Sequence, residues 1–436
     1  MKHPVYSSYR PSGIPWLGHI PNHWEVKRLR FISHVNPSSV KIDDYETLVT
    51  FLPMNNIGES GSLDLSEIRT YNDVRSGYTP LLDNDVCIAK ITPCFENGKG
   101  AICKGFENGI AFGTTELHVV RAHPTVLPQF IFAITKTYAF RSLGEASMTG
   151  AAGQKRVTDI FIKDFPVPLP PLPEQQAIAD YLDQETSRVD ELVRKKERFI
   201  ELLTEKRSAL ISRAVTQGLN PTAPRRPSGI TWLGDIPAHW EVKRLKNLFE
   251  IFNGSTPSSS EESYWEGSIP WVTPDDLGQL NGTIISETGR YLTEEGYHSC
   301  GTSLALEGSI VISTRAPIGH MAIMDVPMCT NQGCKSLSAK KEISSGYFFY
   351  QLLSGKSVLQ SRGCGSTFQE LSKTNLETIT LCCPPLSEQK EIAAFLDAET
   401  SKIESLMEKE RRHIELLGEY RSALITEVVT GRRRIC

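Results

Sequence analysis

Apolar residues recur at intervals of eleven along two segments of the chain that have closely similar sequences. The first segment runs from Pro170 to Gly218 and the second from Pro384 to Gly431. Each opens with prolines followed by Glu and Gln, has no proline after that opening, and closes near a glycine, which are signals for the start and end of a helix. The pattern predicts two helices of about 44 residues, roughly 65 Å long at 1.5 Å per residue.

The apolar rows indicate how these helices pack. In the first helix one row begins at Ile178 and a second at Tyr181, and the second helix repeats both rows 214 positions later. A third row is weaker, because it contains Thr204 and Gly418. Eleven residues make three helical turns, so the stripe runs almost straight and needs a partner of matching length. We expect the helices to pack antiparallel as a rod rather than lie separately on a surface. The positions expected to pack are Ile178, Leu182, Val189, Leu192, Ile200, Leu203, Ile392, Leu396, Ile403, Leu406, Ile414 and Leu417.

The whole chain is duplicated. SGIPWLGHIPNHWEVKRL, from Ser12 to Leu29, returns as SGITWLGDIPAHWEVKRL, from Ser228 to Leu245, with three differences. The offset is 216 here and 214 in the helices, yet the segments between differ almost throughout. A shared scaffold that carries two different binding domains is the natural interpretation. We divide the chain into a first domain (1–165), a central helix (166–219), a second domain (220–380) and a C-terminal helix (381–436).

Short apolar runs broken by Gly, Pro and Asn predict strands in both domains. The first domain contains TLVTFLPM, DVCIAKITPCF and ELHVVRA, and the second contains GSIVISTRAPIGHMAIMDV and SLSAKKE. LPQFIFAITKTYAFRSLG and SGYFFYQLLSGKSVLQSRG each predict one helix late in a domain. The fold class is therefore mixed α/β (α+β), with two domains separated by two long antiparallel helices and related by a pseudo-twofold.

Composition and motifs exclude several functions. No apolar run reaches the length of a membrane span and the N-terminus lacks the apolar core of a signal peptide, so we expect a cytoplasmic protein. The ten cysteines form no CxxC pair, which favours reduced thiols over a metal site. A glycine-rich methyl-donor loop, an (N/D)PP(F/Y) motif and a GxxxxGK[ST] phosphate loop are all missing. An active site within the chain is not expected, and His23 and His239 are assigned structural roles.

Several motifs in order make the chain resemble a known family. WLG.IP.HWEVKRL and PPL.EQ..IA..LD, each present twice, and ITPCFENGKGAI, GTTELHV, TRAPIG and TNQG are similar to the DNA-specificity subunit of type I restriction-modification systems. The resemblance implies two target recognition domains, each reading half of a bipartite, asymmetric site in double-stranded DNA. It also implies two methylation subunits docked on the helical regions, with restriction subunits joining that core. S-adenosylmethionine would then bind the methylation subunit, ATP and Mg the restriction subunit, and no cofactor this chain.

Charge argues against that interpretation. The net charge is −4 and the pI about 6.2, whereas DNA-binding domains are usually basic. A helical adaptor with two protein-binding domains therefore stays open as the alternative. An acidic chain can still bind DNA if its basic residues are segregated on one face or if partner subunits contact the phosphates.

Polar and basic residues at Gly-rich strand junctions are the candidates for DNA contact. Arg and Lys can pair with guanine, Asn and Gln with adenine, and hydroxyls and lysines with the backbone. The candidates in the first domain are Lys90, Asn97, Lys99, Thr114, Thr115, Gln154, Lys155 and Arg156. Those in the second domain are Thr314, Arg315, His320, Asn331, Gln332, Lys335, Thr367 and Gln369. Glu96, Glu116 and Glu370 in the same stretches could accept from cytosine or tie down a loop.

Overall fold

The chain folds into two compact units in this computed structural model, which describes residues 5–38, 40, 42–151, 153–280, 282–363 and 370–435. The first unit combines residues 1–197 with 411–436, and the second consists of residues 198–410. Each unit therefore holds one globular domain, the start of one long helix and the end of the other. No helix in the described parts of the chain is long and apolar enough to cross a membrane.

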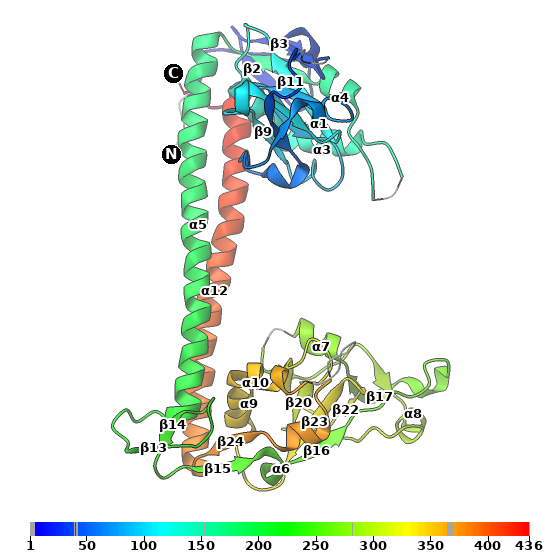
Figure 1. The fold of residues 1–436 in the computed structure, drawn as a ribbon, viewed down its shortest axis with the longest axis vertical. Helices are drawn as coiled ribbons and strands as arrows, with labels where there is room; N and C mark the ends of the chain where they lie inside the picture. Colours follow the sequence, from blue (N-terminus) through cyan, green and yellow to red (C-terminus); the bar gives the residue numbers. More distant parts are fainter. Residues whose placement is uncertain are drawn as a thin grey trace. The chain divides into compact units, whose positions relative to one another are not determined.

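The two long helices confirm the prediction from the eleven-residue pattern. Helix α5 runs from Leu172 to Gln217 and α12 from Leu386 to Val429, and both are continuous (Figure 1). Glycines follow them in the left-handed conformation, with φ of 72° at Gly218 and 71° at Gly431. A residue in this conformation commonly ends a helix, and glycine adopts it at the least steric cost.

In the first unit, the start of α5 packs antiparallel against the end of α12. Ile178 and Leu182 share one buried cluster with Ile425 and its neighbours near the C-terminal end of α12. Further along α5, Asp190 Oδ2 lies 3.6 Å from Arg421 Nη2, which comes earlier in α12. Moving forward along α5 thus means moving backward along α12.

The second unit repeats this arrangement with the roles of the helices exchanged. Leu203 of α5 packs with Ile403 and Met407 of α12. One turn later in α5, Arg207 Nη2 lies 2.7 Å from Glu404 Oε1. Here the end of α5 is antiparallel to the start of α12.

Two predicted packing positions of the second apolar row lie at the edge of the helix pair rather than inside it, which corrects the prediction for those two. Leu192 and Leu406 are 39% and 43% exposed, whereas Leu182 and Leu396 of the third row are buried. Other positions of the second row stay on the packed face, as expected for positions three residues from the first row, because Leu203 is buried and Leu417 is half-buried. Of the other predicted packing positions, Ile178, Val189, Leu203, Ile392 and Ile403 are buried, and Ile200, Ile414 and Leu417 are half-buried.

Two four-stranded sheets form the domain of the first unit. One has the order β6-β5-β10-β7, in which β10 is parallel to β5 and the other neighbours are antiparallel. The other has the antiparallel order β4-β11-β8-β9. The strands of these sheets are β4 (Ser33–Val35), β5 (Leu48–Leu52), β6 (Ile68–Thr70), β7 (Thr79–Leu82), β8 (Val86–Ala89), β9 (Gly100–Ile102), β10 (Ile110–Gly113) and β11 (Leu117–Ala122). The domain also contains two antiparallel strand pairs, which are β1 (Tyr9–Pro11) with β2 (His19–Pro21) and β3 (Glu25–Arg28) with β12 (Pro166–Leu169). Its short helices are α1 (Tyr71–Val74) and α4 (Asp159–Asp164).

The domain of the second unit has a different pair of sheets. A five-stranded sheet has the order β16-β23-β20-β21-β18 and a three-stranded sheet the order β19-β17-β22. Their strands are β16 (Phe249–Asn253), β17 (Trp265–Val272), β18 (Ile284–Ile285), β19 (Tyr291–Leu292), β20 (Ile310–Ser313), β21 (Met321–Met324), β22 (Cys329–Thr330) and β23 (Cys334–Ala339). Two strand pairs repeat those of the first unit: β13 (Arg225–Pro227) with β14 (Asp235–Pro237), and β15 (Glu241–Arg244) with β24 (Thr380–Cys383). The short helices of this domain are α6 (Leu245–Leu248), α7 (Pro274–Gln279), α8 (Glu294–His298) and α11 (Lys373–Glu377).

The late helical segment of each domain is two helices, not the single helix predicted. The first domain has α2 (Pro128–Thr135) and α3 (Tyr138–Ala146), and the second has α9 (Ser345–Ser354) and α10 (Lys356–Ser361). Thr137 restarts the helix in the first domain, because its side chain accepts a 3.2 Å hydrogen bond from Phe140 N as an N-cap. Gly355 occupies the break in the second domain.

The repeated HWEVKRL segment anchors the start of each long helix. In the first unit, Trp24 Nε1 donates to Glu174 Oε2 at 3.1 Å, and His23 Nε2 lies 2.9 Å from the same oxygen. The neighbouring Gln175 accepts from Leu127 N at 2.9 Å and donates to Pro170 O at 2.8 Å. The Glu-Gln pair that marks the helix start in the sequence therefore ties α5 to the N-terminal segment and to α2.

The second unit uses the same contacts. Trp240 Nε1 donates to Glu388 Oε2 at 2.9 Å, and His239 Nε2 lies 2.7 Å from Glu388 Oε1. Gln389 accepts from Ser344 N, the N-cap of α9, at 2.9 Å. These contacts give both histidines the structural role that the sequence analysis assigned to them.

Candidate nucleic-acid interface

Three segments that are distant in sequence meet at one edge of the first domain. Strands β8 and β11 are antiparallel neighbours, so the chain leaves β8 at Lys90 beside the point where it enters β11. Lys90 N donates to Glu116 O at 2.9 Å, and Glu116 N donates to Thr114 Oγ1 at 3.3 Å. The loop before α4 returns to the same edge, where Arg156 forms a β-bridge with Ile91. We call this place the first junction.

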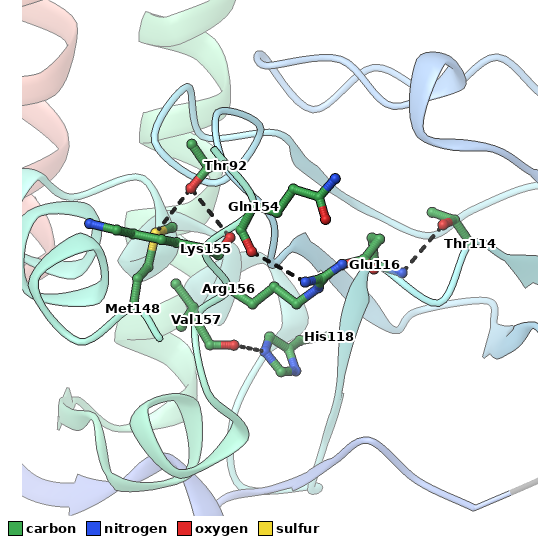
Figure 2. A network of polar contacts seen from close by, with 9 residues as sticks. All are labelled: Thr92, Thr114, Glu116, His118, Met148, Gln154, Lys155, Arg156 and Val157. Atoms are coloured by element: carbon green, nitrogen blue, oxygen red, sulfur yellow. Dashed lines mark hydrogen bonds and ion pairs between the residues drawn. The ribbon is translucent and has the colours of Figure 1, made fainter. Parts of the chain in front are cut away.

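An ion pair with two hydrogen bonds closes the first junction (Figure 2). Arg156 Nε and Nη2 donate to the two carboxylate oxygens of Glu116, each at 2.9 Å. Arg156 Nη1 donates to Gln154 O at 3.2 Å. Hydrogen bonding to the guanidinium lowers the pKa of Glu116, and the carboxylate raises the pKa of Arg156. The fork of Arg156 is thus occupied by Glu116, and Arg156 can pair with guanine only if that carboxylate is displaced.

Other contacts at the first junction leave a set of side chains at the surface. Thr92 N and Thr92 Oγ1 donate to Lys155 O at 3.0 and 3.3 Å, which fixes the backbone of the loop. The side chains of Gln154 and Lys155 then project from this fixed backbone, and both residues are exposed, as is Thr115. The junction thus offers an amide, an ammonium group and a hydroxyl to a ligand.

His118 is a buried residue of the first junction that the sequence analysis did not single out. Its Nε2 donates to Val157 O at 2.9 Å, and Asn36 Nδ2 donates to its Nδ1 at 3.1 Å. Burial lowers the pKa of His118, so the neutral ring that these two hydrogen bonds require is favoured. The sequence feature that points to its burial is its place in ELHVV, an apolar pattern typical of a strand.

Asn97 and Lys99 do not join the first junction. Asn97 is exposed and lines a cavity with Lys136 and Arg141. Lys99 Nζ donates to Met54 O at 3.4 Å. These two residues therefore belong to a different part of the domain from the other six predicted positions.

A second junction has the same construction in the second domain. Arg315, just after β20, forms a β-bridge with Glu370, and Arg315 Nε donates to Glu370 Oε2 at 3.1 Å. Lys335 in β23 approaches the same carboxylate, with Nζ 3.9 Å from Oε1. Burial lowers the pKa of Lys335, whereas the charge of Glu370 opposes that shift. The predicted residues Arg315 and Lys335 therefore meet at one carboxylate.

The remaining predicted residues of the second domain have mixed roles. Thr314 is buried and donates from N to Gly333 O at 2.7 Å, and Asn331 Oδ1 accepts from Gly333 N at 2.8 Å, so both hold the backbone. Gln332 is exposed and contacts Thr256 through its side-chain oxygen. The half-buried His320 donates from N to Ser313 Oγ at 2.9 Å. Thr367 and Gln369 lie outside the described residues.

The two junctions are equivalent in backbone but carry different charged side chains. Ile91 is the second residue after β8, and Arg315 is the second residue after β20. Each forms a β-bridge with a residue of the loop that follows the late helices. The residue on that loop is Arg156 in the first domain and Glu370 in the second. The charged partner of that residue also comes from a different place, because Glu116 precedes β11 whereas Arg315 stands at the position of Ile91, after β20. The same backbone thus presents two different polar surfaces.

The described residues offer no site for a metal ion. Among the described residues, no group of three or more His, Cys, Asp or Glu side chains could hold a metal ion. The eight described cysteines are free thiols. Burial raises the pKa of Cys329 to about 11, which keeps this thiol protonated at neutral pH.

The comparisons with known proteins identify the class of this chain. The family model for the type I restriction modification DNA specificity domain matches twice, over residues 22–202 and 237–416. The chain belongs to this family and carries its domain two times, which agrees with the duplication seen in the sequence. Proteins of this family are specificity subunits and in general are not themselves catalytic.

Individual relatives are specificity subunits of type I restriction enzymes. The chain is 36% identical to the specificity subunit of type I restriction enzyme MjaIX from Methanocaldococcus jannaschii over 43% of each chain. It is 42% identical to the EcoAI specificity subunit from Escherichia coli over 40% of this chain and 30% of that one. These matches span less than half of either relative. A putative MjaX specificity subunit of M. jannaschii is 26% identical over 96% of both chains.

Solved structures share the fold. A chain from a structure of a type I R-M system, solved for its complex assembly and conformational transition, has a TM-score of 0.77 at 20% identity and covers 94% of this chain and 98% of its own. The HsdS subunit from Thermoanaerobacter tengcongensis has a TM-score of 0.56 at 20% identity with the same coverage. Family membership favours the specificity subunit over the protein-binding adaptor.

Proposed function

We propose that this chain is the sequence-specificity subunit of a type I restriction-modification complex and that each domain reads one half of a bipartite, asymmetric site in double-stranded DNA. One observation carries the proposal: the two domains share a junction whose backbone is equivalent and whose charged side chains differ in sign and in position. A reader of two unlike half-sites needs this combination, because direct readout depends on which donors and acceptors reach the base edges.

The exposed side chains of the junctions supply the base contacts. Gln154 and Gln332 have the amide that pairs with adenine, and Lys155 can bind guanine or a phosphate. The acidic balance of the chain means that few phosphates are neutralised by this subunit alone. Partner subunits supply the remaining phosphate contacts and the corresponding salt dependence.

Two methylation subunits dock on equivalent surfaces of the long helices. On α5, Leu192, Phe199 and Leu202 are 39–44% exposed. On α12, Leu406 and Leu416 lie 214 positions after Leu192 and Leu202 and are both 43% exposed. Large exposed apolar residues repeated at one spacing are suited to two copies of the same partner. Restriction subunits join this core, and the helices set the distance between the half-sites.

The cofactors of the reaction belong to those partners. S-adenosylmethionine binds the methylation subunit, and ATP and Mg bind the restriction subunit, whereas this chain takes neither. The complex is then the site-specific adenine methyltransferase and endonuclease, and the present chain selects the site.

Domain exchange tests the assignment of one reader to each half. Residues 31–164 are replaced by the corresponding segment of a relative, and methylation is mapped by sequencing the host genome, with a host lacking the chain as the control. The expected result is a change in one half-site with the other half and the spacing retained. A change in both halves, or in neither, would overturn the proposal.

Native mass spectrometry of the co-expressed complex tests the docking surfaces. The unaltered chain should bind two methylation subunits. Leu202→Glu and Leu416→Glu are equivalent substitutions on α5 and α12. Each should reduce the number of bound methylation subunits to one, because it places a charge in one of the two apolar docking surfaces. Thr204→Glu, on another face of α5, is the matched control and should retain two. A limit of one on the unaltered chain would reject the assembly.

A further inference from the structure

The late helices of the two units meet the long helices through equivalent contacts. Gln175 accepts from Leu127 N and Gln389 accepts from Ser344 N, both at 2.9 Å, and these two donors are the N-caps of α2 and α9. Counting from the caps, the sixth residue of α2 is Ala133 and that of α9 is Tyr350. Both face the long helix that begins in their own unit.

In the second unit a tyrosine fills the space between α9 and α12. Tyr350 is 1% exposed, and its hydroxyl donates to Asp397 Oδ1 at 2.7 Å and lies 3.2 Å from Thr400 Oγ1. Both partners belong to α12. The phenol ring is therefore buried while its hydroxyl is satisfied by a carboxylate, as a buried polar group requires.

In the first unit the same partners surround a cavity. Asp183 and Thr186 of α5 lie 214 positions before Asp397 and Thr400, and both line a cavity of about 520 Å³ together with Ala133. The local geometry is the same, because Thr186 and Thr400 each donate to the carbonyl four residues earlier at 2.7 Å. A methyl group stands where the second unit has a phenol.

The walls of the cavity suit an aromatic ring. Phe132, Leu182 and Ile425 supply apolar surface, and Asp183 supplies an acceptor at the place that corresponds to Asp397. Arg421 also lines the cavity, at the position equivalent to Arg207, 214 residues earlier. The wall is mixed rather than apolar, because Lys104, Lys136 and Asp180 also line it, and such a wall suits a ring that carries a hydroxyl better than a purely apolar ring.

We propose that this cavity binds a phenol-type group, an aromatic ring with a hydroxyl donor, in the place that Tyr350 fills in the other unit. The group comes from a free small molecule or from a tyrosine side chain of a partner. The site is independent of DNA reading, because none of its lining residues belongs to the two junctions.

The probes p-cresol and toluene test the proposal on the full chain, by calorimetry and by the shift in melting temperature. The two rings are similar in size, but only p-cresol can donate to Asp183. We expect p-cresol to bind and raise the melting temperature, and toluene to bind more weakly. Ala133→Tyr should abolish the response, whereas Tyr350→Ala should create a second p-cresol site in the other unit.

Asp183→Ala keeps the test decisive if Ala133→Tyr does not fold, because Asp183 is exposed and its loss should not disturb the core. This variant should bind p-cresol no better than toluene. The proposal is overturned if the unaltered chain does not bind p-cresol, or if it binds both probes equally and Asp183→Ala changes nothing.

Repeating the titration on the complex with the methylation subunit identifies the source of the group. Loss of p-cresol binding in the complex assigns the site to a partner's tyrosine, and retained binding assigns it to a free molecule. This comparison alone rests on the proposed function. If no complex forms, the proposed assembly fails while the p-cresol result on the isolated chain still decides whether the site exists.

Discussion

Arg156 and Glu116, forty positions apart in the sequence, are joined by two parallel hydrogen bonds of 2.9 Å at the edge of the first domain. At the equivalent edge of the second domain, Glu370 occupies the place of Arg156 and is paired with Arg315. The reversed charge at the loop position, with a partner that comes from a different strand end, distinguishes two junctions that have the same backbone connections.

Removing one carboxylate at a time should alter one half-site at a time. Glu116→Gln frees the fork of Arg156 for a base, and Glu370→Gln is the matched change in the second domain. Each should change preference at one position of its own half-site by roughly tenfold or more, the effect of one bidentate base contact. Methylation mapping with both variants would show it. A change in the opposite half-site would contradict the pairing of domains with half-sites.

Stability should fall as the pH falls through the range of His118. The folded pKa of His118 is lowered by burial, so its contribution is present above the unfolded pKa of about 6.5 and is lost at lower pH. Denaturation of the unaltered chain and of His118→Gln between pH 7.5 and 5.5, about one unit either side of that value, should give a smaller loss in the variant. His298→Gln, at an exposed histidine, is the matched control substitution.

The first-turn glutamate of α5 should contribute to stability. Glu174→Ala removes the acceptor of the buried Trp24 indole N–H, which should cost about 1–3 kcal/mol in the free energy of unfolding. Gln184→Ala, nearly three turns further along the same helix, changes an exposed residue and should have little effect. Denaturant titration measures both. Equal stability of the two variants would show that the anchor is not needed.

Two glycines associated with α12 should respond oppositely to alanine. At Gly431, φ is 71° and an added Cβ would lie 2.5 Å from Pro21 Cδ, so Gly431→Ala should lower the melting temperature. At the exposed Gly418, an added Cβ would meet nothing within 4 Å, so Gly418→Ala should stabilise the helix by about 1 kcal/mol. Thermal unfolding distinguishes them, and a gain at Gly431 would contradict the described helix end.

An insertion in α5 should test whether the helices set the distance between half-sites. Four residues added near Thr204, an exposed position, lengthen the helix by roughly 6 Å, which is about two base pairs at 3.4 Å each. Both half-site sequences should be retained and only the gap should grow, as read by methylation mapping. An active variant with an unchanged gap would show that the helices do not measure the site.

The long helices and the duplication could be predicted from the sequence because both depend on local or repeated patterns. An eleven-residue apolar period and terminal glycines act through the helix backbone, so the ends of α5 and α12 lie within two residues of the predicted segments. Which apolar positions lie between the two helices could be predicted less well from the sequence. Whether Leu182 or Leu192 is buried depends on which side of the stripe faces the other helix.

The sequence by itself determined that the chain has two unlike domains on a repeated scaffold, since repetition is visible without coordinates. Only the tertiary structure decided which polar residues act together. Glu116 with Arg156, and Arg315 with Glu370, are brought together by the antiparallel pairing of central strands and a returning loop. Likewise, Asn97 and Lys99 are separated from the first junction although they lie near Lys90 in sequence. Such contacts arise from strand order and loop path, which local propensities do not encode.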